Sequence, residues 1–414
     1  MTSAPSATGP LSGTLVLDLS RVLAGPWATQ VLADLGAEVI KIERPGGGDD
    51  ARAFGPPYLS DPEGKQNNNN SFYLCANRNK KSVTVDMAKP AGADLIRALA
   101  NKADVLVENF KTGGLKKYGL DYAALREANP RLVYCSITGF GQDGPYAGRA
   151  GYDYMIQAMG GLMSVTGQAD GSPGAEPMKV GVAVADLFTG LYASNAILAA
   201  LLHARATGRG QHIDMALFDV QAAMLANQAS NFFVSGVAPT RMGNAHPNLA
   251  PYQPFPTADG AVVIAVGNDG QFRALCGALG CAEAADDPRF LTNALRVQHR
   301  AELVAVLSRR TIERSTDDWL AALEGAGVPC GPINTVDRVF AEPQAQARGL
   351  VVEQAREDLE GPVKTVASPF RLSKTPADYR HAPPALGAHT REVLGQTLGL
   401  DAAALDRLAA EGVI

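Results

Sequence analysis

The first 140 residues alternate short apolar runs with amphipathic segments, and this alternation most limits what the chain can fold into. Apolar runs predict strands, and apolar residues that recur every three to four positions predict helices. The expected strands are Thr14–Leu19, Ala37–Glu43, Asp104–Glu108 and Arg131–Ile137; the expected helices are Ala24–Leu35, Ala91–Ala100 and Tyr122–Ala128. Strands that alternate with helices form parallel βαβ units. We therefore predict an α/β fold with a Rossmann-like, doubly wound parallel sheet.

Such a sheet binds ligands beyond the carboxyl ends of its strands. A site is therefore expected in the loops after Leu19, Glu43, Glu108 and Ile137. The first of these loops lacks the G-x-G-x-x-G pattern of dinucleotide-binding proteins, which argues against a standard dinucleotide site. The polar segment 46–70, which ends in an asparagine tract, is interpreted as a mobile surface loop.

The chain has 414 residues, which favours two domains over one core. We predict a large domain over 1–220, a smaller α/β domain over 221–330, and a part 331–414 that returns to the large domain. The smaller domain has an expected strand at Ala261–Val266, helices at Gly270–Leu279 and Arg300–Arg314, and a helix capped by Ser315 or Thr316. The last part has too few strands for its own core, so it is expected to pack on the large domain or on a partner subunit.

Charge and cysteine content exclude several classes of function. The formal charge of −5 and the lack of basic blocks argue against a nucleic-acid partner. Five scattered cysteines without a C-x-x-C pair argue for a reducing compartment and against structural zinc, and the histidines show no metal spacing. Residues 1–7 are predicted to be a disordered tail without targeting features. The apolar segment 187–202 is interrupted by polar residues, so no membrane span and a cytoplasmic location are expected.

Asp186 is the candidate nucleophile. It lies near the start of an apolar stretch that runs to Ala204, and an acid in the first turn of a helix faces the positive end of the helix dipole. This position is expected to keep the carboxylate ionised. An ionised carboxylate beside a ligand cleft can form covalent intermediates. The alternative is a helix cap without catalytic function.

Six ordered blocks of sequence resemble the family III CoA-transferases. These blocks are Asp18–Pro26 with Leu35–Pro45, Asn77–Ser82, Val107–Phe110, Gly151–Asp153, Asp186–Gly190 and Thr207–Gln211. The resemblance covers nearly the whole chain. It implies a homodimer of two interlocked chains, with active sites between the subunits.

The resemblance also implies a mechanism and a set of contacts. Asp186 matches the residue that forms an aspartyl anhydride and then an aspartyl-CoA thioester. Coenzyme A and acyl-CoA act as substrates, and no prosthetic group is implied. The implied CoA contacts are Leu23, Ala24, Arg44, Asn109, Phe110 and Lys117. Arg44 and Lys117 suit the phosphates of CoA, and Phe110 suits stacking on its adenine.

Within the family, the blocks around 149–153, 241–253 and 327–334 are most similar to the succinyl-CoA:glutarate CoA-transferases and related dicarboxylate enzymes. The expected acceptors are small carboxylic acids such as glutarate, itaconate or a sulfinate analogue of succinate. Arg241 is the first candidate for binding the far carboxylate because a guanidinium binds carboxylates with two hydrogen bonds. His246 is a candidate to orient the acceptor, and Tyr152 is a further candidate for substrate binding. Whether the loop 241–253 closes over Asp186 is left open.

The alternative within this fold is an α-methylacyl-CoA racemase. Racemisation requires a base on each face of the α-carbon, and the racemases have a histidine where this chain has Tyr152. A phenol, with an ordinary pKa of about 10, is a poor base at neutral pH. A thioesterase is disfavoured because no G-x-S-x-G motif occurs. A CoA-binding module without catalysis would not need the surroundings of Asp186.

Overall fold

The structure is a computed structural model that describes residues 9–414. It divides into two compact units. The first unit contains the chain up to Leu162, Val180–Ser230 and Gln346–Ile414, and the second contains Met163–Lys179 and Asn231–Ala345. The second unit thus includes a segment near 170 that the sequence prediction placed in the large domain. The predicted N-terminal tail, residues 1–7, lies outside the described residues.

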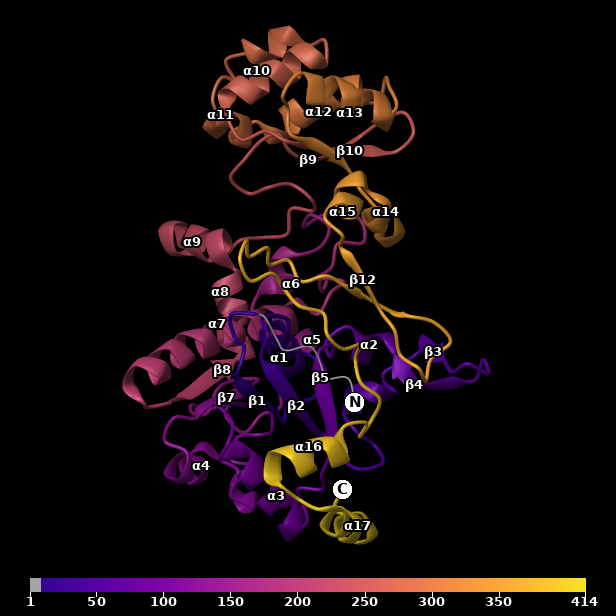
Figure 1. Cartoon of the computed structure of the whole chain (residues 1–414). Coiled ribbons are helices and arrows are strands. Elements are labelled where there is room, and N and C mark those ends of the chain that lie inside the picture. The colour runs from indigo at the N-terminus through magenta and orange to yellow at the C-terminus, as the bar shows by residue number, and fades with distance from the viewer. Residues whose placement is uncertain (1–8) are drawn as a thin grey trace. The chain divides into compact units, whose positions relative to one another are not determined.

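A six-stranded parallel sheet forms the centre of the first unit (Figure 1). Its strand order is β5-β2-β1-β6-β7-β8. The strands are β1 (Leu15–Asp18), β2 (Glu38–Glu43), β5 (Lys80–Thr84), β6 (Val105–Glu108), β7 (Val133–Thr138) and β8 (His212–Ala216). Strand order reverses between β1 and β6, so the sheet is doubly wound with a switch point there. The predicted parallel sheet is confirmed.

Strand β5 was missed from the sequence because its residues are mostly polar. The sequence Lys-Lys-Ser-Val-Thr shows no apolar run. In the structure, Lys80 and Ser82 are nevertheless buried, because Lys80 pairs with Asp18 at 3.1 Å and Ser82 donates a hydrogen bond to Glu43 at 2.6 Å. Polar partners inside the sheet therefore replace the hydrophobic contacts that usually reveal a buried strand.

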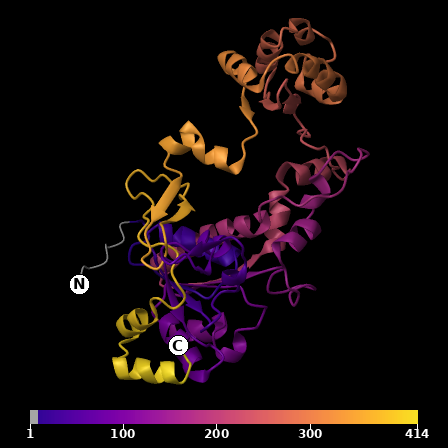
Figure 2. The same ribbon diagram turned by 90° about the vertical axis from the view of Figure 1, so that its right-hand side faces the viewer.

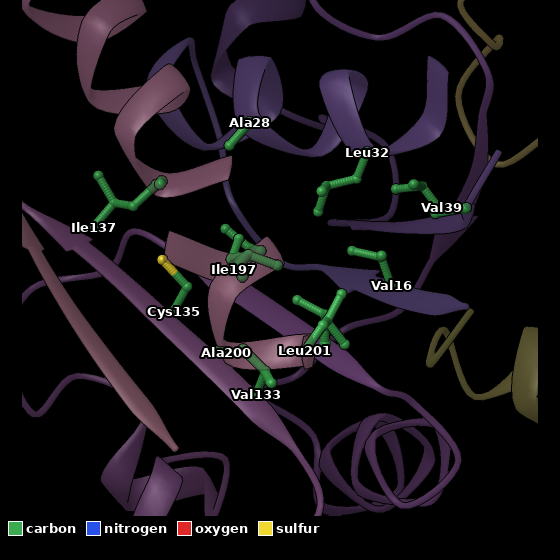
Figure 3. Close-up of a cluster of buried hydrophobic side chains, with 14 of the residues drawn as sticks. Val16, Ala28, Leu32, Val39, Val133, Cys135, Ile137, Ile197, Ala200 and Leu201 are labelled. Carbon is green, nitrogen blue, oxygen red and sulfur yellow. The ribbon is translucent and has the colours of Figure 1, made fainter. Parts of the chain in front are cut away.

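Helices cover both faces of the sheet. On one face lie α1 (Ala24–Asp34) and α7 (Val184–Thr207), and on the other α3 (Pro90–Ala100), α4 (Tyr122–Ala128) and α16 (Thr390–Leu398). Consecutive strand residues alternate between the two cores: Val16 belongs to the first cluster and Leu17 to the second. Figure 3 shows the first cluster, where Val16, Ala28 and Ile197 meet between the sheet and the two helices.

Helix α7 packs closely against α1. A Cβ atom on Gly190 would lie 2.6 Å from the carbonyl oxygen of Ala24, so only glycine allows this approach. By length and composition α7 is also the one helix of residues 9–414 that could cross a membrane. Its apolar residues Ala193, Ile197 and Leu201 are buried in the sheet-facing core, which accounts for its hydropathy. Because α1 begins after β1, this packing brings the start of α7 towards the carboxyl end of the sheet.

The segment 46–70, interpreted from the sequence as a mobile surface loop, contains regular secondary structure that the sequence did not predict. It contains the 3-10 helix η1 (Asp50–Ala53) and an antiparallel hairpin of β3 (Tyr58–Ser60) and β4 (Gln66–Asn70). The Asn70 side chain is fully buried, accepts a hydrogen bond from the Tyr73 N–H and donates one to the carbonyl of Ala51. The asparagine tract thus supplies internal hydrogen bonds that composition alone does not reveal.

The second unit has its own core around an antiparallel sheet in the order β11-β10-β9. Its main elements are β9 (Tyr252–Pro256), β10 (Ala261–Ala265), β11 (Cys330–Pro332), α10 (Asp269–Ala278), α12 (Arg300–Thr311) and α13 (Thr316–Gly325). Phe255, Phe272 and Trp319 are buried between the sheet and the helices. Ser315 caps α13 by accepting a hydrogen bond from the Asp318 N–H, as the sequence predicted.

Shorter elements complete the two units. They are α2 (Ser71–Leu74), α5 (Asp153–Met159), α6 (Leu162–Val165), α8 (Leu217–Met224), α9 (Ala226–Ser235), α11 (Asn293–Gln298), α14 (Val336–Ala341), α15 (Pro343–Ala347), η2 (Lys116–Tyr118) and η3 (Ala282–Ala285). The chain passes between the two units at four positions, of which three lie in α6, α9 and α15 and the fourth lies between Lys179 and Val180.

The C-terminal segment returns to the first unit. Its elements are the antiparallel pair β12 (Val351–Gln354) and β13 (Val363–Val366), then α16 and α17 (Ala402–Ala410). Helix α16 packs on β5 and α3, where the N–H of His389 donates to Ser82 and the N–H of Thr84 donates to Thr390 (Figures 1 and 2). Residues Gln346–Ile414 thus belong to the same compact unit as the six-stranded sheet.

Candidate active site

Asp186 lies in the first turn of α7, as the sequence predicted, and lines a cavity of about 210 Å³. Burial and the nearby Asp153 carboxylate raise the pKa of Asp186 to about 7. This differs from the expectation that the helix dipole keeps the group ionised. Loss of solvation and a neighbouring negative charge outweigh the dipole, which acts only over the first turn.

Asp153 positions the start of α7. Its Oδ1 accepts hydrogen bonds from the N–H groups of Ala185 at 2.8 Å and Asp186 at 3.3 Å, and its Oδ2 accepts one from Gln157 at 2.6 Å. An acid that binds free N–H groups at a helix start stabilises that end of the helix. The same acid that orients the Asp186 backbone therefore also raises the pKa of the Asp186 side chain.

The cavity beside Asp186, called here the active-site cavity, brings together six of the predicted residues. These are Leu23, Ala24, Asn109, Phe110, Tyr152 and Asp186. They come from the loops after β1, β6 and β7 and from the start of α7. The cavity thus lies at the switch point of the sheet, where doubly wound proteins bind ligands.

A second cavity of about 290 Å³ lies at the ends of β1, β2, β5 and β6. It contains the two predicted phosphate contacts, Arg44 and Lys117, and shares Phe110 and Arg21 with the active-site cavity. The guanidinium of Arg21 lies 4.9 Å from the centroid of the Phe110 ring. The predicted stacking partner of adenine is therefore already in contact with an arginine.

The loop between β1 and α1 is held by hydrogen bonds from three other segments. Asn109 accepts from the N–H of Arg21 at 2.9 Å and donates to its carbonyl at 2.8 Å. Asp49 accepts from the N–H of Val22 at 2.9 Å, and Lys41 donates to the carbonyl of Ser20 at 2.9 Å. Val22 has a φ of 69°, a left-handed conformation that is strained for a β-branched residue. These contacts maintain the strained backbone next to the predicted CoA contacts Leu23 and Ala24.

Buried ion pairs lie beneath this loop. Lys41 pairs with Asp49 at 2.8 Å and Lys80 with Asp18 at 3.1 Å, and all four side chains are excluded from solvent. Burial alone would raise the pKa of Asp18, but Lys80 and Lys41 lower it to about 2. Burial lowers the pKa of Lys80 to about 8, and Asp18 opposes this shift. We refer to Asp18, Lys41, Asp49 and Lys80 as the buried ion network.

Arg241 and His246 belong to the second unit, and their contacts lie within it. Arg241 forms an ion pair with Asp170, whose N–H also donates to the Arg241 carbonyl at 3.2 Å. The His246 ring lies 5.1 Å from that of Tyr252 and accepts a hydrogen bond from the Asn248 N–H. Partial burial and Arg300 lower the pKa of His246. The active-site cavity is lined by residues of the first unit, so these two side chains are not among them.

Three cationic residues that sequence reasoning did not select line the active-site cavity: Arg21, Lys111 and Arg149. Arg21 pairs with Asp50 at 2.8 Å. Arg21 and Arg149 stand in sequence blocks that carry the family resemblance, so their position in those blocks was a usable signal. That they line the same cavity as Asp186 was not predicted, because they are far from Asp186 along the chain.

The model of CoA-transferase family III matches residues 11–390 of this sequence. The chain belongs to CoA-transferase family III. The predicted resemblance is therefore confirmed, and the protein is an enzyme of the CoA-transferase class.

Individual relatives agree with this family assignment. The family III chain is 53% identical over 396 residues to the succinate–glutarate CoA-transferase of Agrobacterium fabrum, covering 96% of this chain and 98% of that protein. It is 45% identical to the succinyl-CoA:glutarate CoA-transferase of Mus musculus, covering 98% and 90%. A solved CAIB/BAIF family protein from Brucella suis has 51% identity and a TM-score of 0.82, with 94% of this chain and 100% of that chain covered.

Proposed function

We propose that this protein transfers CoA from succinyl-CoA to glutarate or a similar dicarboxylate. The observation that carries this proposal is the Asp186 carboxylate, which lines a cavity at the sheet's switch point. The family supports CoA transfer, and the names of the relatives support succinyl-CoA and glutarate as the pair of substrates. Itaconate and a sulfinate analogue of succinate are further acceptors to be tested, since both carry two acidic ends.

In the proposed mechanism, the ionised Asp186 attacks the thioester carbonyl and the CoA thiolate leaves, which forms a mixed anhydride. The thiolate then attacks the Asp186 carbonyl and releases the donor acid, which leaves an aspartyl-CoA thioester. The acceptor carboxylate attacks this thioester, the thiolate leaves again, and a second anhydride forms. Attack of the thiolate on the acceptor carbonyl gives the new acyl-CoA and regenerates Asp186. No water is consumed, so the cavity must exclude it.

The two cavities support a proposal in which each binds a different part of the CoA molecule. Arg44 and Lys117 of the second cavity are proposed to bind phosphates, while Leu23 and Ala24 bind the pantetheine end beside Asp186. The first N–H groups of α1 have no partner within the helix and suit an oxygen of the reacting carbonyl. Phe110 lines both cavities and is proposed to stack on the adenine, and Asn109, which lines the active-site cavity, is proposed as a further CoA contact. No prosthetic group takes part in this scheme.

Tyr152 is proposed to contact the acyl group, because it lines the active-site cavity. Arg241 and His246 are proposed as contributions of the second unit to acceptor binding. For Arg241 this role requires exchange of its ion pair with Asp170 for one with the substrate. The racemase alternative would need a second base where this chain has Tyr152.

We also propose an interlocked homodimer in the cytoplasm. Helix α9 supports a subunit contact, because Phe233 is 79% and Val234 is 90% exposed in the single chain. Exposed apolar groups of this kind mark surfaces that another chain covers. Light scattering of the purified protein tests the dimer, and a monomer at micromolar concentration would contradict it.

The experiment that tests the activity combines succinyl-CoA with a panel of mono- and dicarboxylates and identifies acyl-CoA products by mass spectrometry. Glutaryl-CoA formed by the wild type and not by Asp186→Ala supports the proposal. Intact-protein mass spectrometry should detect a CoA adduct on the wild type in the absence of acceptor. Scrambling of a chiral 2-methylacyl-CoA without any exchange would instead favour the racemase.

A further inference from the structure

Arg149 is the cationic residue of the active-site cavity that best suits a second carboxylate. Of the three cations that line this cavity, Arg21 is already paired with Asp50. In residues 9–414 the guanidinium of Arg149 forms no ion pair with a carboxylate, and its side-chain polar contact is a weak one to the Met159 sulfur at 3.9 Å. The cavity that contains Asp186 therefore also presents an arginine available for an anion.

The loop 139–151 holds Arg149 at this position. Its two ends touch, since a Cβ atom on Gly139 would lie 2.5 Å from the Cα atom of Gly151. This contact between glycines closes the loop at the carboxyl end of β7. Within the loop, the N–H of Arg149 donates to the carbonyl of Tyr146 at 2.9 Å. The backbone of Arg149 is thus anchored near the cavity although its side chain is exposed.

Two aromatic rings orient the guanidinium. It lies 4.5 Å from the centroid of the Tyr146 ring and 5.2 Å from that of Phe140, and these rings contact each other edge to face at 5.4 Å. Contact with aromatic rings uses the face of a guanidinium and leaves its N–H groups, which lie in its plane, free to donate. Such a group matches a planar carboxylate, which accepts two parallel hydrogen bonds.

We propose that Arg149 binds the distal carboxylate of the dicarboxylic acyl group while the proximal carboxyl carbon reacts at Asp186. This inference rests on the proposed function and identifies its specificity residue. The succinyl group of the donor and the acceptor acid occupy the cavity at different steps of one cycle, so the same guanidinium serves both. Arg241, in contrast, already has a carboxylate partner in Asp170.

Lys111 provides a matched control because it lines the same cavity, is exposed and forms no ion pair in the part of the chain that the structure describes. Lys111→Met, like Arg149→Met, removes one positive charge from the cavity lining. The Lys111 substitution does not, however, remove a planar group with parallel donors. A difference between Arg149→Met and Lys111→Met therefore isolates directional binding from general electrostatic attraction.

The test compares kcat/KM for glutarate with kcat/KM for pentanoate, an acid of equal chain length with one carboxylate. For Arg149→Met, we expect this ratio to fall about 30-fold or more, because a charge pair in a binding site is lost. Arg149→Lys should recover part of the ratio, and Lys111→Met should change it by less than about threefold because a rim charge contributes little. The ratio for succinyl-CoA over butyryl-CoA should fall in parallel in Arg149→Met.

An unchanged ratio in Arg149→Met, or an equal fall in Lys111→Met, would overturn the assignment. Arg241→Met is measured beside these two variants. A larger fall of the glutarate-to-pentanoate ratio in Arg241→Met would assign binding of the distal carboxylate to Arg241 instead. Titration calorimetry with glutarate separates this inference from the proposed function. Glutarate that binds the wild type and not Arg149→Met supports the assignment even if no transfer occurs, whereas failure of transfer would contradict only the proposed function.

Discussion

The buried ion network and the charged lining of the active-site cavity differ in how their charges are satisfied. Asp18, Lys41, Asp49 and Lys80 have no solvent exposure, and each pairs with an opposite charge. Asp186 in α7 and Arg149 in the loop after β7 line the active-site cavity without an ion-pair partner among the described residues. Paired charges hold the backbone of the site, and unpaired charges remain available for substrate.

The largest expected effect comes from removing the nucleophile. Asp186→Ala should lower CoA transfer by about 10⁴-fold or more, because no other group can form the covalent intermediates. Chromatographic assay of glutaryl-CoA measures the loss. Thermal unfolding serves as the control and should show no loss of stability, because the side chain forms no ion pair within residues 9–414. Residual CoA transfer above about one per cent of the wild-type rate would show that Asp186 is not the nucleophile.

The comparison predicts that removing a buried charge affects stability far more than removing a cavity charge. Lys41→Met leaves Asp49 without its partner and should lower the free energy of unfolding by about 3–5 kcal/mol. Lys111→Met, which removes an exposed charge, should change it by less than about 0.5 kcal/mol. Urea denaturation measures both values. Equal effects would show that the buried network has no special structural role.

The raised pKa of Asp186 predicts a pH-dependent rate. The attacking form is the carboxylate, so kcat/KM for succinyl-CoA should increase about tenfold between pH 6 and pH 8 for a pKa of about 7. Asp153→Asn keeps an oxygen that can accept from the Ala185 N–H but removes the neighbouring charge, so its profile should shift to lower pH. A profile of the wild type that is flat from pH 5 to 8 would show that Asp186 is already ionised.

The smallest expected effect concerns the strained loop. Val22→Gly should raise the free energy of unfolding by about 1 kcal/mol, because glycine adopts a φ of 69° without steric cost. Val22→Ala keeps most of that cost and is the matched control. Chemical denaturation of the two variants measures the difference. If Val22→Gly is no more stable than Val22→Ala, the loop is not strained in solution.

Sequence periodicity predicted most of the first unit correctly. The strands around Val16, Val39 and Val133, the helix over 24–35 and the apolar helix that begins near Asp186 show clear local apolar patterns. The segments that failed are those whose polar side chains find partners far along the chain. Lys80 in β5 meets Asp18, and Asn69 in β4 accepts a hydrogen bond from Arg356. A local pattern contains no information about such partners.

The sequence by itself determined the α/β class, the family and the position of Asp186 at a helix start, because these depend on residues near one another in the chain. Only the tertiary structure decided which side chains share a cavity and which charges are paired. It placed Arg149 in the same cavity as Asp186 and gave Arg241 a carboxylate partner. It also raised the pKa of Asp186, since burial and the approach of Asp153 are properties of the folded chain. Electrostatic effects depend on distance in space and on solvent exclusion, and neither quantity is encoded in local periodicity.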